Sequence, residues 1–273
     1  MRGPLVALLL WAFWPGRAAE AAFERLPIGI REMALSGAGV GLMGGSDAGA
    51  FNPAGLGGSG RRYLSLFYSP SLFGLDDLRH SALAYVEPFS WGVVGVSASV
   101  FGCALYRETT LAAECVIEVV PGCRAGVRCA VMSLRIQDYG GASALGVDAG
   151  FTFRVSPLVD IGGAVGNLNA PSIGQIPERL PQTITLGLTL HPTSAASLCA
   201  AIYSDQLFSP EFRFGVEYSP LPEVILRGGV CEDPSSYTAG FGFSYSGFVV
   251  EYAYLAHRDL GGSHAFGLSI VLE

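Results

Sequence analysis

Apolar residues alternate with small or polar residues along the back two-thirds of the chain, and this period of two constrains the fold more than any other feature. From Ser143 to Ser156, one face carries Leu, Val, Ala and Phe, whereas the other carries small residues with Asp148 and Arg154. From Leu180 to His191, leucine and isoleucine alternate with threonine and glycine. Successive side chains of a β-strand point to opposite faces. These segments are therefore predicted to be strands of an all-β protein.

The turn residues divide the chain into about fourteen candidate strands, an even number, as single-chain bacterial outer-membrane barrels require. They are predicted at 61–69, 79–87, 91–103, 106–120, 124–136, 143–156, 159–168, 180–191, 196–205, 211–218, 223–232, 236–245, 248–255 and 264–272.

The connections between these strands favour a transmembrane β-barrel over a soluble sandwich. Every second connection is short and rich in Pro or Gly, as at Pro121-Gly122, Ser156-Pro157 and Ser246-Gly247. The intervening connections, such as 69–78 and 169–179, are often longer. Tight periplasmic turns that alternate with longer extracellular loops are typical of outer-membrane barrels. We therefore expect an antiparallel barrel with both chain ends in the periplasm.

Composition also indicates a surface covered by lipid. Half of the residues are hydrophobic and only 14% are charged. Tyr237, Phe241, Phe243 and Tyr245 share one strand face, and aromatic side chains favour the membrane interface. The alternative is a soluble periplasmic β-protein that buries these rings in its core. The net charge of −7 argues against a nucleic-acid partner.

The first 21 residues resemble a secretory signal peptide. Arg2 precedes an apolar stretch from Leu5 to Trp14, which is too short to span a bilayer, and Ala19-Glu20-Ala21 is a small-x-small cleavage signal. Cleavage is expected near Ala21, so the remaining chain is exported. The six cysteines form no metal-type C-x-x-C pair, and the sequence leaves their pairing open.

Charged residues of both signs fall on the small, polar face of the predicted strands. A basic residue that faced lipid at the middle of the membrane would cost ~2–4 kcal/mol, so these side chains are expected inside the barrel. Three interpretations of these charges remain: they line a polar path, they hold a plug by ion pairs, or they only neutralise one another in a packed lumen. The predicted lumen charges are Asp148, Arg154, Asp160, Arg213, Glu217, Arg227 and Glu251.

Enzymatic activity is not expected, because the common hydrolase, zinc-protease and phosphate-loop motifs are missing from the sequence. The four histidines are scattered at segment ends and are predicted to be interface or loop residues rather than metal ligands. Ser263-His264 near Asp259 is the nearest triad candidate, but its members are adjacent in sequence rather than placed to face one another. No cofactor or metal site is predicted.

The segment before the first strand, residues 22–60, is rich in Gly, Ala and Ser and has no clear period. In Asn52-Pro53-Ala54, the asparagine suits a helix cap and the proline suits the first helical position. A compact Gly-rich segment of this kind can pack inside a wide barrel. We therefore predict a plug at 22–60 and a barrel at 61–273; the alternative is a surface loop.

Several motifs in the same order resemble the PorV/PorQ group of the FadL-like outer-membrane proteins. They are Met33-Ala34-Leu35-Ser36-Gly37-Ala38-Gly39, Phe51-Asn52-Pro53-Ala54-Gly55-Leu56, Glu251-Tyr252-Ala253-Tyr254 and Gly261-Gly262-Ser263-His264. The resemblance implies a fourteen-strand barrel with an N-terminal plug in the outer membrane of a Gram-negative bacterium. It also implies passage of a hydrophobic small molecule, gated around Asn52, Pro53 and Ala54. The alternative that it implies is binding of exported proteins in type IX secretion, through loops 169–179 and 256–263.

Overall fold

The structure is a computed structural model that describes residues 22–45, 48–58, 60–174, 178–206, 209–232 and 234–272. The predicted signal peptide at residues 1–21 lies outside these ranges. Within them, no helix is long and apolar enough to cross a membrane.

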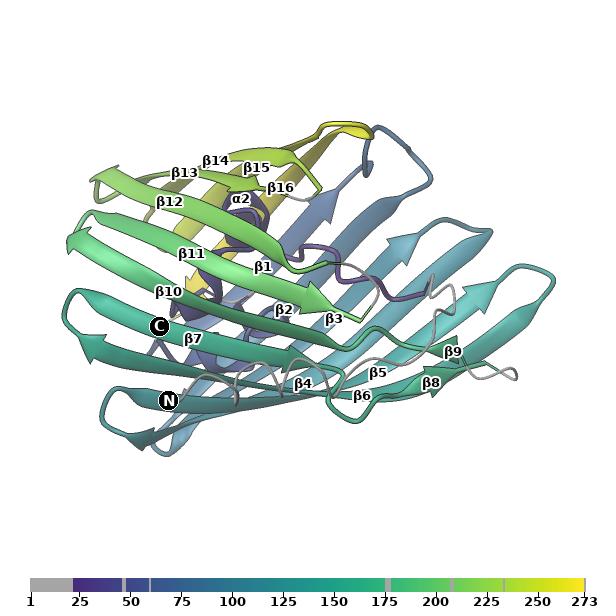
Figure 1. Cartoon of the computed structure of the whole chain (residues 1–273), viewed down its shortest axis with the longest axis horizontal. Helices are drawn as coiled ribbons and strands as arrows, with labels where there is room; N and C mark the ends of the chain where they lie inside the picture. Colours follow the sequence, from purple (N-terminus) through teal and green to yellow (C-terminus); the bar gives the residue numbers. More distant parts are fainter. Residues whose placement is uncertain are drawn as a thin grey trace, which may run out of the picture.

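Fourteen antiparallel strands close into one barrel, in which β1 pairs with β16 (Figure 1). The barrel strands are β1 (Arg62–Ser69), β2 (Arg79–Phe89), β3 (Gly92–Gly102), β4 (Tyr106–Val120), β5 (Cys123–Ile136), β6 (Gly140–Ser156), β7 (Val159–Gly166), β10 (Thr183–Thr193), β11 (Ala196–Asp205), β12 (Glu211–Leu221), β13 (Val224–Cys231), β14 (Ser236–Tyr245), β15 (Phe248–His257) and β16 (Gly261–Leu272). The predicted fold class is confirmed, and closure excludes the sandwich.

The two ends of the barrel differ in their connections. At one end, which we call the turn end, two residues join each pair of strands, as at 121–122 and 246–247. At the other, the loop end, connections run from three residues (137–139) to sixteen (167–182). The longest carries the small hairpin of β8 (Ser172–Ile173) and β9 (Glu178–Arg179), which the sequence pattern did not predict.

Strand boundaries differ from the predicted ones by a few residues. The strand predicted from residue 180 begins at Thr183, because Pro181 has no N–H group to donate to a neighbouring strand. The predicted loop at 256–263 is shorter, since β15 runs to His257 and β16 begins at Gly261.

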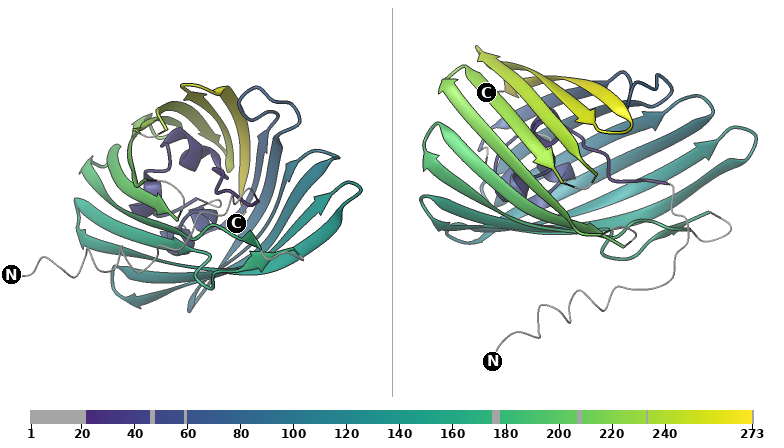
Figure 2. Two further views of the ribbon diagram at one scale, coloured as in Figure 1. Left: turned by 45° about the vertical axis from the view of Figure 1, so that its right-hand side comes forward. Right: turned by 45° about the horizontal axis from the view of Figure 1, so that its top comes forward.

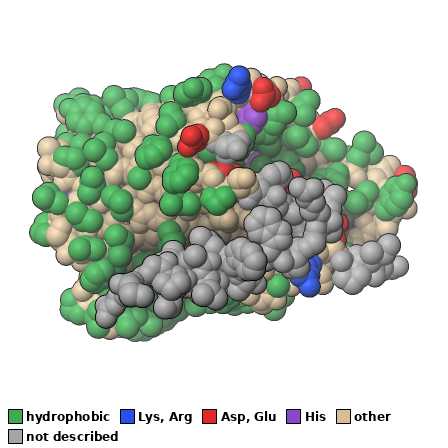
Figure 3. Space-filling view, viewed as in Figure 1, with side chains coloured by type: hydrophobic (Ala, Val, Ile, Leu, Met, Phe, Trp, Pro, Cys, Tyr) green, Lys and Arg blue, Asp and Glu red, His purple; other side chains and the backbone are tan. Residues whose placement is uncertain are grey.

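The outer face of the barrel is apolar. Side chains predicted to face lipid are exposed there, among them Leu145, Tyr237 and Phe241. Figure 3 shows hydrophobic side chains spread over one face of the barrel, whereas most charged side chains visible in that view lie in its right half, toward the loop end. This distribution is typical of a barrel that spans a membrane.

The described residues of the N-terminal segment, 22–45, 48–58 and 60, run inside the ring of strands (Figure 2). Helix α2 (Ile30–Ala34) contacts β13 to β16, and the short 3₁₀ helix η1 (Gly39–Gly41) contacts β7, β10 and β11. Two more 3₁₀ helices follow, η2 (Ala48–Ala50) and η3 (Pro53–Gly58), and η3 contacts β3 to β6. The segment starts near Glu108 at the loop end and joins β1 at the turn end.

Glycines on the inner face let the backbone of this segment lie directly against the wall. A Cβ atom at Gly162 would sit 2.3 Å from the Val40 carbonyl oxygen, and one at Gly126 would sit 2.4 Å from the Ala54 nitrogen. Such distances leave no room for any other residue type unless the segment moves. The backbone of the segment also approaches Gly229 closely, and side-chain atoms of Ala34 and Ile30 approach Gly240 and Gly267.

Apolar side chains of the segment supply the packed interior that the wall alone lacks. Ile30, Met33 and Ala34 pack against Phe67 and Ala253, whereas Leu56 packs against valines of β2, β3 and β4. Where the segment lies, the lumen is therefore filled by a packed hydrophobic core. All six cysteines lie in described ranges and are free thiols.

Candidate functional site

Asn52 connects the two halves of the N-terminal segment to the barrel wall. Its side chain is buried, and its amide nitrogen donates hydrogen bonds to the carbonyl oxygens of Val40 (2.7 Å) and Phe151 (3.1 Å). Its side-chain oxygen accepts a hydrogen bond from the Ala54 N–H at 3.1 Å, which caps η3 as the Asn-Pro-Ala sequence predicts. Pro53 and Ala54 lie against Gly126 of β5. All three motif residues thus hold the segment in place.

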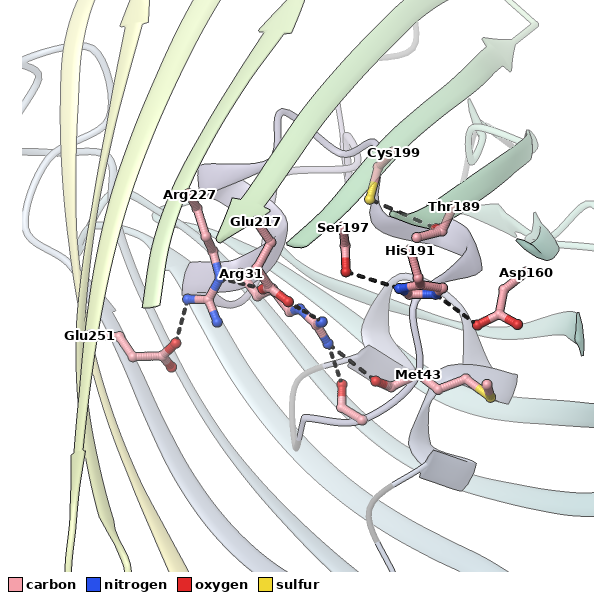
Figure 4. A network of polar contacts seen from close by, with 11 residues as sticks. Arg31, Met43, Asp160, Thr189, His191, Ser197, Cys199, Glu217, Arg227 and Glu251 are labelled. Atoms are coloured by element: carbon pink, nitrogen blue, oxygen red, sulfur yellow. Dashed lines mark hydrogen bonds and ion pairs between the residues drawn. The ribbon is translucent and has the colours of Figure 1, made fainter. Parts of the chain in front are cut away.

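A chain of charges anchors the segment at α2 (Figure 4). The Arg31 guanidinium contacts the Glu217 carboxylate of β12 at 2.6 Å, and Glu217 also accepts a 2.7 Å hydrogen bond from Arg227 of β13. Arg227 reaches Glu251 of β15 at 2.6 Å. Arg31 also donates to the carbonyl oxygen of Met43. Three of the predicted lumen charges therefore meet, and the partner from the segment, Arg31, lies in a stretch whose sequence has no period to reveal it.

Glu217→Ala is expected to destabilise the folded barrel by about 3 kcal/mol, because Arg31 and Arg227 would both lose the Glu217 carboxylate, although Arg227 would keep Glu251. Glu87→Ala is the matched control: its partner Arg62 is 48% exposed, and solvent screens an exposed pair so that it contributes little to stability. Equilibrium urea unfolding in detergent micelles measures both changes. Equal losses in the two variants would contradict the anchoring role of Glu217.

The remaining lumen charges form three separate pairs or clusters. Asp148 pairs with Arg128 at 2.9 Å, and Arg128 also contacts Glu114 at 3.2 Å. Arg213 pairs with Glu211 at 2.7 Å and lies over the ring of Tyr203. Glu114, Arg128 and Glu211 were missed by the sequence reasoning, although their positions in the strand alternation place them on the inner face.

The third cluster joins Asp160 to two partners at the turn end. One carboxylate oxygen contacts Arg154 at 3.0 Å, and the other contacts Nε2 of His191 at 3.0 Å. Nδ1 of His191 lies 3.1 Å from the Ser197 hydroxyl (Figure 4). His191 is therefore a partner in the lumen rather than an interface or loop histidine, which corrects the prediction.

This Ser–His–Asp connectivity differs from a hydrolytic triad in two respects. Ser197 meets the ring nitrogen nearer the histidine backbone, and Asp160 is shared with an arginine. The sequence-adjacent candidate also fails, since Ser263 is buried and accepts a hydrogen bond from Phe73 whereas His264 bonds Tyr252. Among the described residues, no group of three or more His, Cys, Asp or Glu is arranged to hold a metal ion.

A cavity of about 680 Å³ lies in the lumen between the N-terminal segment and the loop end; we call it the lumen cavity. Small-molecule sites commonly occupy ~300–1,000 Å³. Its polar lining includes Glu108, Arg128, Asp148 and Arg213. Its apolar lining comes from the segment and the wall and includes Phe23, Leu26, Ile28, Phe51, Phe101 and Tyr203. The cavity can hold a largely apolar molecule and contact it with a few polar groups.

No protein-family model and no curated protein matches the chain. Solved structures do match it at low identity. The structure described as the CymD monoaromatic hydrocarbon channel is 14% identical, with a TM-score of 0.70 over 92% of this chain and 99% of that one. The Pseudomonas putida toluene transporter TodX is 13% identical, with a TM-score of 0.66 over 92% and 100%. A Pseudomonas aeruginosa FadL homologue is 12% identical, with a TM-score of 0.62 over 90% and 98%. The chain therefore shares its fold with these barrels.

Proposed function

We propose that the protein is an outer-membrane barrel of a Gram-negative bacterium that passes a hydrophobic small molecule, with the N-terminal segment as its gate. In this proposal, residues 1–21 are a signal peptide, residues 22–60 form the plug and residues 61–273 form the barrel. The protein's partners are outer-membrane lipid and the molecule it carries. The observation that carries the proposal is the lumen cavity, which adjoins both the loop end and the segment.

The surroundings of the cavity support this function. The barrel presents apolar side chains outward, which suits a protein that lies in a membrane and carries an apolar molecule. The neighbours described as toluene and monoaromatic hydrocarbon channels carry small apolar molecules. The proposed substrate of this chain is of the same chemical kind.

The segment is proposed as a gate because it lies between the lumen cavity and the turn end. Beside the segment, two smaller voids measure only about 20 Å³ each, about enough for a single water molecule. A molecule held in the lumen cavity reaches the turn end only if part of the segment moves. The contacts of Asn52 and Arg31 then set how readily that movement occurs.

Filling the lumen cavity tests the proposal. Ser99 lines it from β3, and the next residue, Val100, faces outward with 39% exposure. Ser99→Trp is expected to lower uptake of radiolabelled toluene by whole cells severalfold, because the indole occupies the cavity. Val100→Trp places the same ring in the lipid-facing surface and is expected to leave uptake unchanged. Uptake that does not depend on expression of the barrel would contradict the function.

The second function, binding of exported proteins in type IX secretion, would use the connection at 167–182. This connection is the longest at the loop end, and hydrogen bonds from Asn167 to the Pro181 carbonyl and from Gln182 to the Asn167 carbonyl tie its ends together. Affinity purification from the native envelope tests this function. Recovery of the barrel without any protein partner would contradict it.

A further inference from the structure

Glu108 is a buried carboxylate at the loop end for which the described residues supply no cation. It is 8% exposed and accepts hydrogen bonds from the Phe23 N–H (2.9 Å) and from the Tyr106 hydroxyl. None of the nine ion pairs found in the described part of the chain includes it. A buried carboxylate without an opposite charge is destabilising. A cation beside Glu108 would offset this cost.

The arginines that line the same cavity are bound to other groups. Arg25 donates to the Thr183 hydroxyl and to two backbone carbonyls, and Arg128 contacts Glu114 and Asp148. The sequence contains no lysine, because all 16 of its basic residues are arginine. A cation that the chain can still provide next to Phe23 is an α-ammonium group.

Ala22 is in the right place to provide it. The residue is 4% exposed and packs against Met132, Ile173 and Leu180 at the loop end. It directly precedes Phe23, whose N–H donates to Glu108, and consecutive residues are only ~3.8 Å apart. Ala22 also directly follows Ala19-Glu20-Ala21, the small-x-small cleavage signal.

We propose that the mature chain begins at Ala22 and that Glu108 binds its α-ammonium group. The proposal rests on cleavage of the signal peptide after Ala21. A signal peptidase hydrolyses the Ala21–Ala22 peptide bond, so that water contributes its hydroxyl to the Ala21 carbonyl carbon and its remaining hydrogen to the Ala22 nitrogen. The new amine takes a further proton from solvent and becomes the ammonium that pairs with Glu108.

This ion pair fixes the first residue of the N-terminal segment at the loop end. Arg31 holds the first third of the segment, and Asn52 holds its last third. Phe23, the residue after the new terminus, lines the lumen cavity, so the ion pair also sets one wall of that cavity. The binding site for the terminus exists whether or not the barrel carries a substrate.

The absence of lysine makes the test specific, because the α-amino group is then the only primary amine of the mature protein. Barrel purified from the outer membrane is acetylated with N-hydroxysuccinimidyl acetate near neutral pH, and intact mass reports both the first residue and the extent of labelling. Acylation needs the neutral amine, and a carboxylate partner keeps the amine protonated. Wild-type protein is therefore expected to react at least about tenfold more slowly than Glu108→Gln.

Two further variants separate pairing from general loosening of the structure. Glu24→Gln removes an exposed carboxylate from the same segment, and its labelling rate is expected to stay close to that of wild type. One glycine inserted after Ala21 moves the amine by ~3.8 Å while Glu108 remains, and labelling is expected to be as fast as in Glu108→Gln. A first residue other than Ala22, or equal rates in wild type, Glu108→Gln and the insertion variant, would overturn the proposal.

Discussion

Deleting residues 33–60 is expected to turn a closed barrel into an ion-conducting one. The deleted residues include η1 and η3, which contact the wall from β3 through β11, and η2, which contacts η3. They also include most of the apolar side chains that fill the lumen. A fourteen-strand barrel without this filling is wide enough for water and ions, so single-channel conductance in planar bilayers should rise on the order of tenfold or more. Unchanged conductance would contradict the plug and its role as gate.

A replacement variant shows whether specific packing or mere bulk closes the lumen. A Gly-Ser linker of the same length in place of 33–60 keeps the chain connected but lacks Asn52 and the apolar side chains. Its conductance is expected to match that of the deletion, because no contact holds the linker against the wall. In both variants, retained heat-modifiable migration on a denaturing gel confirms that the barrel itself has formed.

The second large effect is the release of the N-terminal segment when a side chain is added at Gly229 on the inner wall. A Cβ atom at Gly229 would lie 2.6 Å from the Leu35 carbonyl carbon and 2.8 Å from the Ser36 nitrogen. Both are backbone atoms, which cannot rotate away as a side chain can. Gly229→Val is therefore expected to release the N-terminal segment. Overpacking of this kind costs about 1–3 kcal/mol, which shifts the equilibrium between the packed and the released segment roughly fivefold to 150-fold.

The neighbouring glycine provides the control. Gly228 faces the other side of β13, and a Cβ atom there would meet only the Thr238 carbonyl oxygen at 3.7 Å, an ordinary contact. Limited trypsin digestion measures how accessible the segment is, because trypsin cleaves after arginine and the segment contains Arg25 and Arg31. Gly229→Val is expected to be cut within the segment much faster than wild type, whereas Gly228→Val should match wild type. Equal protection of both variants would show that the segment does not depend on close approach at β13.

The charges of the lumen show how far sequence reasoning reached. Each predicted lumen charge was assigned to a face from the strand period, and that period also places Glu114 and Arg128 inward. The strand period does not show which of these charges form pairs. Glu217 pairs with Arg227 across β12 and β13, but its other partner is Arg31 of the segment. His191 was assigned to an interface or loop for the same reason, since its partners Asp160 and Ser197 come from separate strands.

The sequence by itself determined the number of barrel strands, the outward-facing apolar side of each strand and the Asn-Pro-Ala cap, because a two-residue period and a helix cap depend only on neighbours along the chain. Only the tertiary structure decided the course of the N-terminal segment, the lumen cavity above it and the lack of a cation partner for Glu108 within the described residues. These features depend on barrel closure and on a segment that has no period. Closure brings together residues that are far apart in the sequence, and no local sequence pattern shows which of them will meet.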